Sequence, residues 1–208
     1  MRATRRGGAQ RGRKMGMLVL GLVVFLGAHS VRIFAEGWRT RGIARLGEMG
    51  WKGLYAVVSL IGLALIVWGF AQARLQPVVL WSPPAMLKHL NALFTLLAFI
   101  GVAAAYVPRN RLRARLHHPM VLGVKLWAFG HLLATGTLAD LVLFGAFLLW
   151  AVLDFRAARQ RDRALGTVHA PGAMGPTVLA VVVGGVAWAV FAFWLHAAWI
   201  GVAPFPRA

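Results

Sequence analysis

The feature that most restricts how this chain can fold is a series of apolar blocks, most of them about twenty residues long. In a bilayer core about 30 Å thick, every backbone N–H and C=O must be hydrogen-bonded within the protein, so only helices or a closed barrel can cross it. Strands of a barrel alternate in polarity, and these blocks do not. Of the 208 residues, 60% are apolar, compared with about 45–50% in soluble domains. The sequence therefore predicts an all-α fold, a polytopic membrane helical bundle with about six transmembrane helices.

The blocks place one transmembrane domain at residues 17–205, after a basic arm at residues 1–16. The arm is either a disordered extension or sequence ahead of a later start methionine. Six spans are predicted: Met17–Phe34, Trp51–Ala73, Met86–Tyr106, Pro119–Ala134, Leu138–Phe155 and Thr177–Val202. The fourth is the shortest, because its 16 residues rise only about 24 Å as a helix. Glycines in several spans indicate close helix packing, namely Gly62, Gly69, Gly184 and Gly185.

The distribution of charge between the spans predicts how the chain is oriented. Twelve Lys and Arg residues occupy the first, third and fifth connections, whereas the second and fourth connections and the C-terminal tail carry three. Connections rich in Lys and Arg stay on the cytoplasmic side. The arm adds six basic residues that favour the opposite orientation. Because three connections outweigh one tail, we expect a multi-pass protein with an N-out and C-out arrangement.

The formal net charge of +18 does not indicate a nucleic-acid-binding protein, because the basic residues cluster between apolar blocks. Membrane lipids with anionic headgroups are the expected partner, and no nucleic acid is expected. The chain has no cysteine, which excludes disulfides, Cys-ligated clusters, thiolate-ligated haem and covalently attached c-type haem. Paired carboxylates, a Ser-His-Asp order, a Walker loop and a GxGxxG motif are all absent from the sequence.

Two histidines are predicted to lie at similar depth in the membrane. His29 precedes Gly37 by eight residues, or about 12 Å, and His131 follows Pro119 by twelve residues, or about 18 Å from the same face. Such a pair on different helices is the geometry of a b-type haem with two axial imidazoles. Arg32 lies on nearly the same face as His29 and would be placed to contact a haem propionate. The alternative interpretation is that both histidines are polar contacts between packed helices.

A lysine inside the fourth span is the second unusual feature. Ionisable groups cost about 2.5–3.5 kcal/mol at the centre of a membrane helix, so they mark a site or an interior contact. Lys125 follows His118 by seven residues, which places both on one helix face. One interpretation is a vestibule where both bind an anionic group, such as a haem propionate or a lipid phosphate, near the helix N-terminus. The other is that Lys125 reaches back to the membrane interface.

The remaining polar residues have simpler expected roles. Asp140 is expected to interact with the dipole at the start of its helix, with a proton or cation contact as the alternative. Asp154 and Asp162 are expected to balance the arginines that follow the fifth span. His117 and His118 are expected to lie at the interface and to contact lipid phosphate or the anionic group of a ligand rather than a metal, and His169 is expected to be solvated.

Several short motifs follow one another along the chain. They are Phe25-Leu26-Gly27-Ala28-His29-Ser30-Val31-Arg32, Gly50-Trp51-Lys52-Gly53-Leu54-Tyr55, Leu80-Trp81-Ser82-Pro83-Pro84, His118-Pro119-Met120, Lys125-Leu126-Trp127-Ala128, His131-Leu132-Leu133-Ala134-Thr135-Gly136-Thr137-Leu138-Ala139-Asp140 and Leu143-Phe144-Gly145. Together these motifs resemble the NnrU family, and the resemblance covers about Met15 to Phe205.

The resemblance implies a protein of the bacterial inner membrane, linked to the reduction of nitric and nitrous oxide in denitrification. The family is also similar to plant zeta-carotene isomerase, a membrane haem enzyme that isomerises a cis double bond. By that similarity, haem b would be the cofactor, with His29 and His131 as axial ligands of its iron. The isomerase has a cysteine three positions before the second histidine. This chain has Ala128 there, which puts a redox-dependent exchange of that ligand in doubt.

Two hypotheses follow, and whether the protein is an enzyme stays open between them. In the first, it binds haem b and is a redox or nitric-oxide-responsive subunit, or an isomerase of an apolar polyene. Its partner would then be a respiratory membrane complex or a small apolar ligand. In the second, it is a non-enzymatic transport or assembly factor for nitrogen-oxide respiration. The first predicts that Nε2 of His29 and Nε2 of His131 approach to about 4 Å, with one iron between them.

Overall fold

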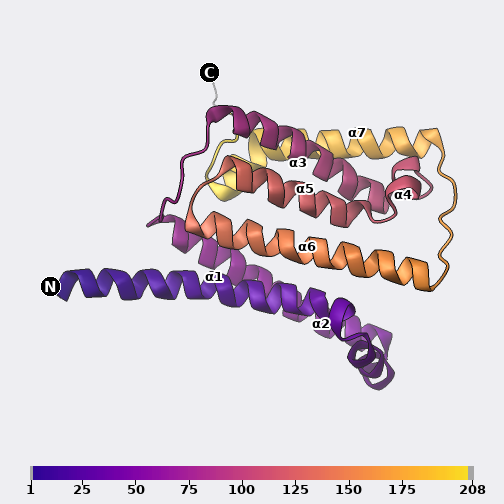
Figure 1. The fold of residues 1–208 in the computed structure, drawn as a ribbon, viewed down its shortest axis with the longest axis horizontal. Coiled ribbons are helices and arrows are strands. Elements are labelled where there is room, and N and C mark those ends of the chain that lie inside the picture. The colour runs from indigo at the N-terminus through magenta and orange to yellow at the C-terminus, as the bar shows by residue number, and fades with distance from the viewer. Residues whose placement is uncertain (1, 206–208) are drawn as a thin grey trace. The chain divides into compact units, whose positions relative to one another are not determined.

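The computed structural model describes the backbone of residues 2–205, with side chains at residue 12 and at residues 14–205. Within this range the chain is helical and forms no β-strand, which confirms the all-α prediction. The elements are α1 (Arg2–Phe34), α2 (Glu36–Arg74), α3 (Ala85–Tyr106), α4 (Arg111–Leu116), α5 (Pro119–Ala134), α6 (Leu138–Ala164), α7 (Met174–Val190) and the π-helical segment η1 (Phe191–Ile200) (Figure 1).

Within the described residues, five helical stretches are long and apolar enough to cross a membrane. They are Lys14–Phe34, Glu36–Arg74, Ala85–Tyr106, Leu138–Ala164 and Met174–Ile200. Helix α5 is the short sixth, and its bounds are those predicted from the sequence. The basic side chains of the arm, apart from Lys14, and Arg207 lie outside the described residues. The effect of the basic arm on membrane orientation is therefore argued from its sequence alone.

Helix α2 departs from the predicted arrangement, because the first connection is helical as well. Its 39 residues would span about 58 Å, far more than a bilayer core. The helix is broken at Gly47, whose φ of 71° is in the left-handed region that favours glycine. The part after Gly47 includes the predicted span Trp51–Ala73. The first connection therefore folds as a separate helical stretch before the kink.

The chain forms two compact units. Unit 1 holds α1, α2, the segment up to Trp81 and the stretch Thr137–Ala146 at the start of α6. Unit 2 holds α3, α4, α5, the remainder of α6 from Phe147, α7 and η1.

Unit 1 is built on a close pair of helices, α1 and α2. A Cβ added to Gly62 would lie 2.7 Å from the backbone nitrogen of Phe25, and one added to Gly69 would overlap the backbone of Leu18. Only glycine permits this approach, which confirms the prediction for both positions. The start of α6 is capped within the same unit: the hydroxyl of Thr137 donates to Oδ2 of Asp140, and the backbone N–H of Asp140 donates back to that hydroxyl. Asp140 is thus a helix-capping residue.

Unit 2 is built around α3, which packs against α5 and α7 (Figure 1). A Cβ on Gly184 of α7 would lie 2.6 Å from Cα of Ile100, and one on Gly123 of α5 would lie 2.8 Å from the carbonyl oxygen of Ala98. The prediction of close packing holds for Gly184. It is wrong for Gly185, where an added Cβ would have nothing within 4 Å, because this residue lies on a different side of α7 from Gly184.

Candidate functional site

At one end of unit 2, the α3–α4 connection is fixed by a buried asparagine. Asn110 is 1% exposed, and its amide donates to the carbonyl oxygens of Ala104 at 2.8 Å and Val107 at 2.5 Å. Its Oδ1 accepts from the backbone N–H of Arg113 at 2.7 Å, so it also caps α4. Asn110 was not among the residues singled out from the sequence. An asparagine directly before an arginine-rich helix is the signal that could have found it.

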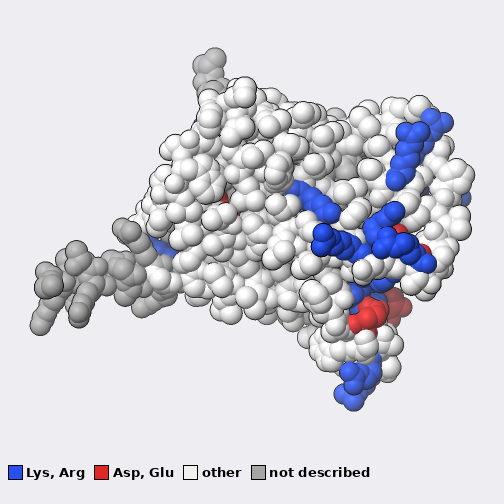
Figure 2. Space-filling model, viewed as in Figure 1, with Lys and Arg blue, Asp and Glu red and all other residues white. Residues whose placement is uncertain are grey.

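The same connection is tied to the start of α7. The backbone N–H of Ala173 donates to the carbonyl of Arg109, and that of Arg111 donates to Oγ1 of Thr177. The third and fifth connections therefore lie at one end of unit 2. Figure 2 shows Lys and Arg side chains gathered on the surface around α4 and the end of α6. In the sequence, the third and fifth connections carry eight arginines: Arg109, Arg111, Arg113, Arg115, Arg156, Arg159, Arg161 and Arg163.

The chain turns sharply after α6, and this turn positions His169. Gly166 has φ 58°, in the left-handed region where glycine is favoured. The backbone N–H of Thr167 bonds back to the carbonyl of Asp162 at 2.9 Å, which closes the C-terminal turn of the helix. The following segment therefore returns toward the helix end, and His169 lies beside Asp162.

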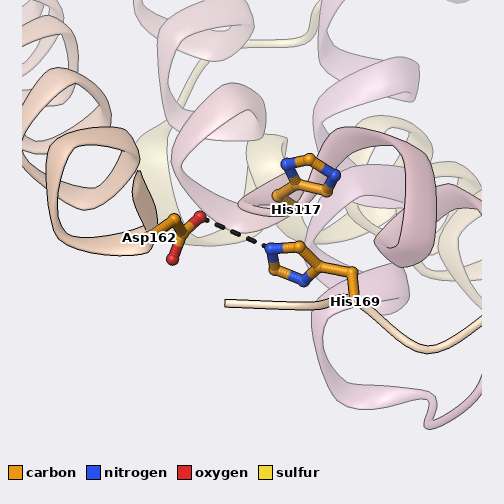
Figure 3. Close-up of side chains that lie close together, drawn as sticks. All are labelled: His117, Asp162 and His169. Carbon is orange, nitrogen blue, oxygen red and sulfur yellow. Dashed lines mark ion pairs between the residues drawn. The ribbon is translucent and has the colours of Figure 1, made fainter. Parts of the chain in front are cut away.

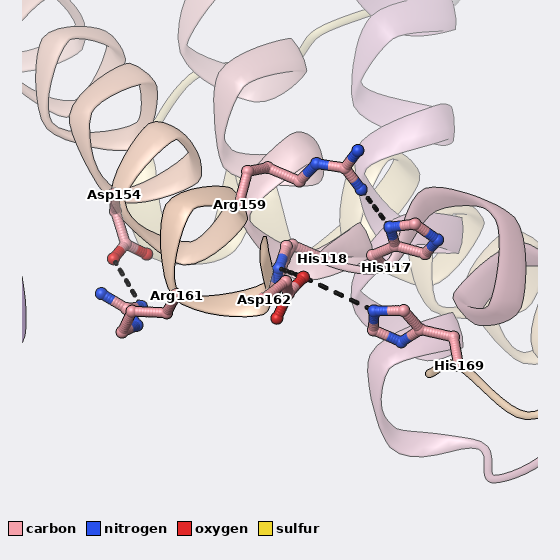
Figure 4. Close-up of polar contacts among 7 residues, drawn as sticks. All are labelled: His117, His118, Asp154, Arg159, Arg161, Asp162 and His169. Carbon is pink, nitrogen blue, oxygen red and sulfur yellow. Dashed lines mark hydrogen bonds and ion pairs between the residues drawn. The ribbon is translucent and has the colours of Figure 1, made fainter. Parts of the chain in front are cut away.

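Asp162 is the centre of a polar network formed by three segments of unit 2 (Figure 4). Nε2 of His118, at the start of α5, donates to Oδ2 of Asp162 at 2.7 Å. Nε2 of His169 lies 3.4 Å from the same oxygen. The Asp162 side chain is 20% exposed, so these contacts are partly shielded from solvent.

His117 completes the network. Its ring stacks on that of His169, with centroids 3.9 Å apart and planes 5° from parallel. The guanidinium of Arg159 donates to its Nδ1. Partial burial, followed by the nearby His169 and Arg159, lowers the pKa of His117 below its usual value. The lowered pKa favours the neutral form of His117, in which one ring nitrogen keeps a lone pair.

Two expectations about these residues were wrong. Asp162 contacts two histidines rather than the arginines that flank it, because the carboxylate faces α5 and the α6–α7 connection. His169 is not solvated, since the turn at Gly166 brings it back onto Asp162. Asp154 does pair with an arginine, Arg161, at 4.0 Å.

The predicted vestibule residues both face α6. Nζ of Lys125 lies 3.8 Å from the centroid of the Phe155 ring, and the His118 ring meets Phe155 edge-on with centroids 6.1 Å apart. Lys125 is half-buried. The two residues therefore share the face that packs against Phe155. Binding of an anionic group there stays a prediction.

The predicted haem ligands lie one in each unit: His29 on α1 in unit 1 and His131 on α5 in unit 2. Nδ1 of His29 is 2.7 Å from the carbonyl oxygen of Phe25, and Nδ1 of His131 is 2.8 Å from that of Trp127. A carbonyl oxygen only accepts, so Nδ1 is the donor in both rings. A ring held in this way presents Nε2 to a metal, so both side chains fit the role of an axial haem ligand.

Each of these rings also has aromatic neighbours. His29 stacks on Phe25 at 4.2 Å between centroids and lies 5.2 Å from Tyr55, and the ring of His131 lies 5.4 Å from that of Trp127. Arg32, three residues after His29, is exposed on α1. The predicted approach of the two Nε2 atoms to about 4 Å stays a prediction.

One comparison with known proteins is informative. The family model described as NnrU protein matches residues 17–204, nearly the whole chain. No curated protein and no solved structure matches it. The match begins at the predicted start of the first span and leaves the basic arm outside.

Proposed function

We propose that this chain, which belongs to the NnrU family and is a multi-pass membrane protein, binds one b-type haem. The iron ligands in this proposal are His29 and His131. The observation that supports the proposal is that the two imidazoles make the same hydrogen bond. In each, Nδ1 donates to the carbonyl four residues earlier, which leaves Nε2 as the ligand atom. Arg32 would contact a propionate.

When bound, a haem held by His29 and His131 would supply one-electron transfer or an iron that a small molecule such as nitric oxide could bind. The chain's own contribution is to fix both ring orientations and surround them with Phe25, Tyr55 and Trp127. We propose that this serves nitrogen-oxide metabolism in a bacterial inner membrane. Isomerisation of an apolar polyene is the second haem-dependent activity that the resemblance supports.

Orientation is part of the proposal. The third and fifth connections meet at one end of unit 2, and each carries four arginines. We place this end in the cytoplasm, with both chain termini on the other side. The alternative function is a membrane transport or assembly factor without haem, in which His29 and His131 serve only as polar groups among packed helices.

The test is the absorption spectrum of the purified protein, expressed with a haem precursor in the medium. The proposal predicts a Soret band and the sharp visible bands of low-spin haem. His29→Ala and His131→Ala should each convert the spectrum to a five-coordinate high-spin form, and the double variant should lose haem. His89→Ala is the matched control, because His89 is an exposed histidine on α3. A haem-free wild-type protein, or single variants with unchanged spectra, would favour the transport or assembly factor.

A further inference from the structure

We propose that His117, Asp162 and His169 form a binding site for a divalent transition-metal ion of the zinc class, at the arginine-rich end of unit 2. This site does not depend on the proposed haem ligands, since its three residues include neither His29 nor His131 and all three belong to unit 2.

The donor set fits such an ion. Two imidazoles and one carboxylate are borderline nitrogen and oxygen ligands of the kind that bind Zn²⁺ in sites with an open fourth position. One donor atom from each residue lies within 4.8 Å of the other two (Figure 3). The residues come from three separate segments: the end of α4, the last turn of α6 and the α6–α7 connection.

The distance between two of the donors already matches a metal site. Nε2 of His169 lies 3.4 Å from Oδ2 of Asp162. Bonds of about 2.0–2.1 Å in a tetrahedron place neighbouring ligand atoms about 3.3–3.4 Å apart. The His169 Nε2 is also buried, and its approach to Asp162 Oδ2 is an ion-pair contact rather than a well-formed hydrogen bond. A buried polar atom of this kind usually has a ligand, and a cation between the nitrogen and the carboxylate would satisfy it.

The surroundings supply a supporting contact. Ligating carboxylates are usually held by further hydrogen bonds, and the His118 ring donates to Asp162 at 2.7 Å. In this structure the His117 ring lies face to face on the His169 ring, so the in-plane lone pairs of the two rings do not converge on one point and His117 must turn to act as a ligand. His117 must approach the other two donors more closely than its present separation, which a side-chain rotation at the end of α4 can provide.

Arg159 competes with the metal. Its guanidinium donates to Nδ1 of His117, so a cation bound through that nitrogen must displace it (Figure 4). The nearby arginines also repel a cation. Asp162 in turn disfavours an anion at the centre of the cluster. We therefore infer a site of moderate affinity, whose strength is limited by Arg159.

The experiment uses the full chain in detergent, purified through a histidine-free tag and stripped of metal with a chelator. Zinc affinity is measured by competition with a fluorescent zinc indicator, and Co²⁺ absorption reports the coordination geometry. Wild type should bind about one equivalent of Zn²⁺ and show the intense visible bands of tetrahedral Co²⁺. His169→Ala and Asp162→Asn should abolish both signals, while His89→Ala keeps them. His118→Ala should weaken binding about 10–100-fold.

Arg159→Gln should bind zinc more tightly than wild type, because it removes the competing guanidinium. Misfolding does not raise zinc affinity, so this variant separates a lost ligand from a misfolded protein. If its affinity is not higher than that of wild type, His117 is not a ligand and the three-residue site is wrong. If wild type takes up no more zinc than His169→Ala, the cluster is a polar clamp without a metal, and the proposal fails. Neither result affects the haem spectrum, so failure here is distinguishable from failure of the proposed function.

Discussion

The two groups of histidines in this protein differ in how much of the fold must be in place to assemble them. His117, Asp162 and His169 meet within unit 2, through the capped α4 and the turn at Gly166. His29 and His131 are each held by their own helix, through a bond to the carbonyl four residues earlier, and belong to different units. The first group is a product of connections between helices. In the second group, each helix sets the orientation of its own ring.

This difference predicts that haem binding and zinc binding can be removed separately by single substitutions. These losses are the largest effects we expect. His131→Ala should lose the low-spin haem spectrum and keep zinc affinity close to that of wild type, since His131 and the cluster lie toward opposite ends of α5. His169→Ala should lose zinc binding and keep the haem spectrum. Absorption spectra and indicator competition on the same two preparations measure both. Loss of both ligands in either single variant would mean that the sites are not independent.

A topology measurement sharpens the comparison by placing the cluster on one side of the membrane. Reporter fusions after Leu116 and after Leu165 should both show a cytoplasmic location, because the third and fifth connections each carry four arginines. A fusion at Trp81, in the second connection, is the matched control and should show the opposite side. If the first two fusions were periplasmic, the basic arm would control the orientation instead.

The cluster should also depend on the buried asparagine that organises its end of unit 2. Asn110→Ala removes the cap of α4 and leaves the carbonyls of Ala104 and Val107 without their donor. We expect a loss of about 1–3 kcal/mol in the free energy of unfolding, together with weaker zinc binding. Denaturation followed by tryptophan fluorescence measures the first quantity. Asn91→Ala is the control, because Oδ1 of Asn91 accepts no hydrogen bond. An equal loss in both variants would remove the special role of Asn110.

The helices could be predicted from the sequence because their signals are local. The predicted bounds of α5 are those observed, and the lengths of the other apolar blocks predicted the other spans. The first connection was missed as a helix, because its charged residues are typical of a loop and only the conformation of Gly47 separates it from the span.

The cluster of His117, Asp162 and His169 could not be predicted, because the signals that form it are not local. Asp162 and His117 are 45 residues apart, and the contact depends on backbone conformations that residue types do not specify. His117 has φ 63°, which is uncommon for a non-glycine residue, and only the folded loop imposes it. Gly166 was the one local signal, since a glycine just past a helix indicates a reversal of the chain.

A change at that glycine tests the reversal directly. Gly166→Ala forces a side chain into the left-handed region at a cost of about 1–2 kcal/mol, so the turn should loosen and zinc affinity should fall severalfold. Gly185→Ala is the control, because nothing lies near the added Cβ and the residue is in a helix. Indicator competition measures both. Unchanged affinity in Gly166→Ala would show that the turn does not position His169.

The smallest expected effect concerns Lys125, which lies on α5 between His118 and His131 and belongs to neither group. Its ammonium lies over the ring of Phe155, which the His118 ring also contacts. If that face binds the anionic edge of a cofactor or a lipid phosphate, the lysine contributes about 1 kcal/mol, or about fivefold in affinity. We therefore expect Lys125→Leu to lower haem content severalfold under limiting haem, with zinc binding unchanged and membrane yield maintained. Lys88→Leu, at an exposed position on α3, is the control. Equal haem content with an equal or better yield would leave only the interpretation in which Lys125 reaches toward the membrane interface, and the vestibule would be excluded.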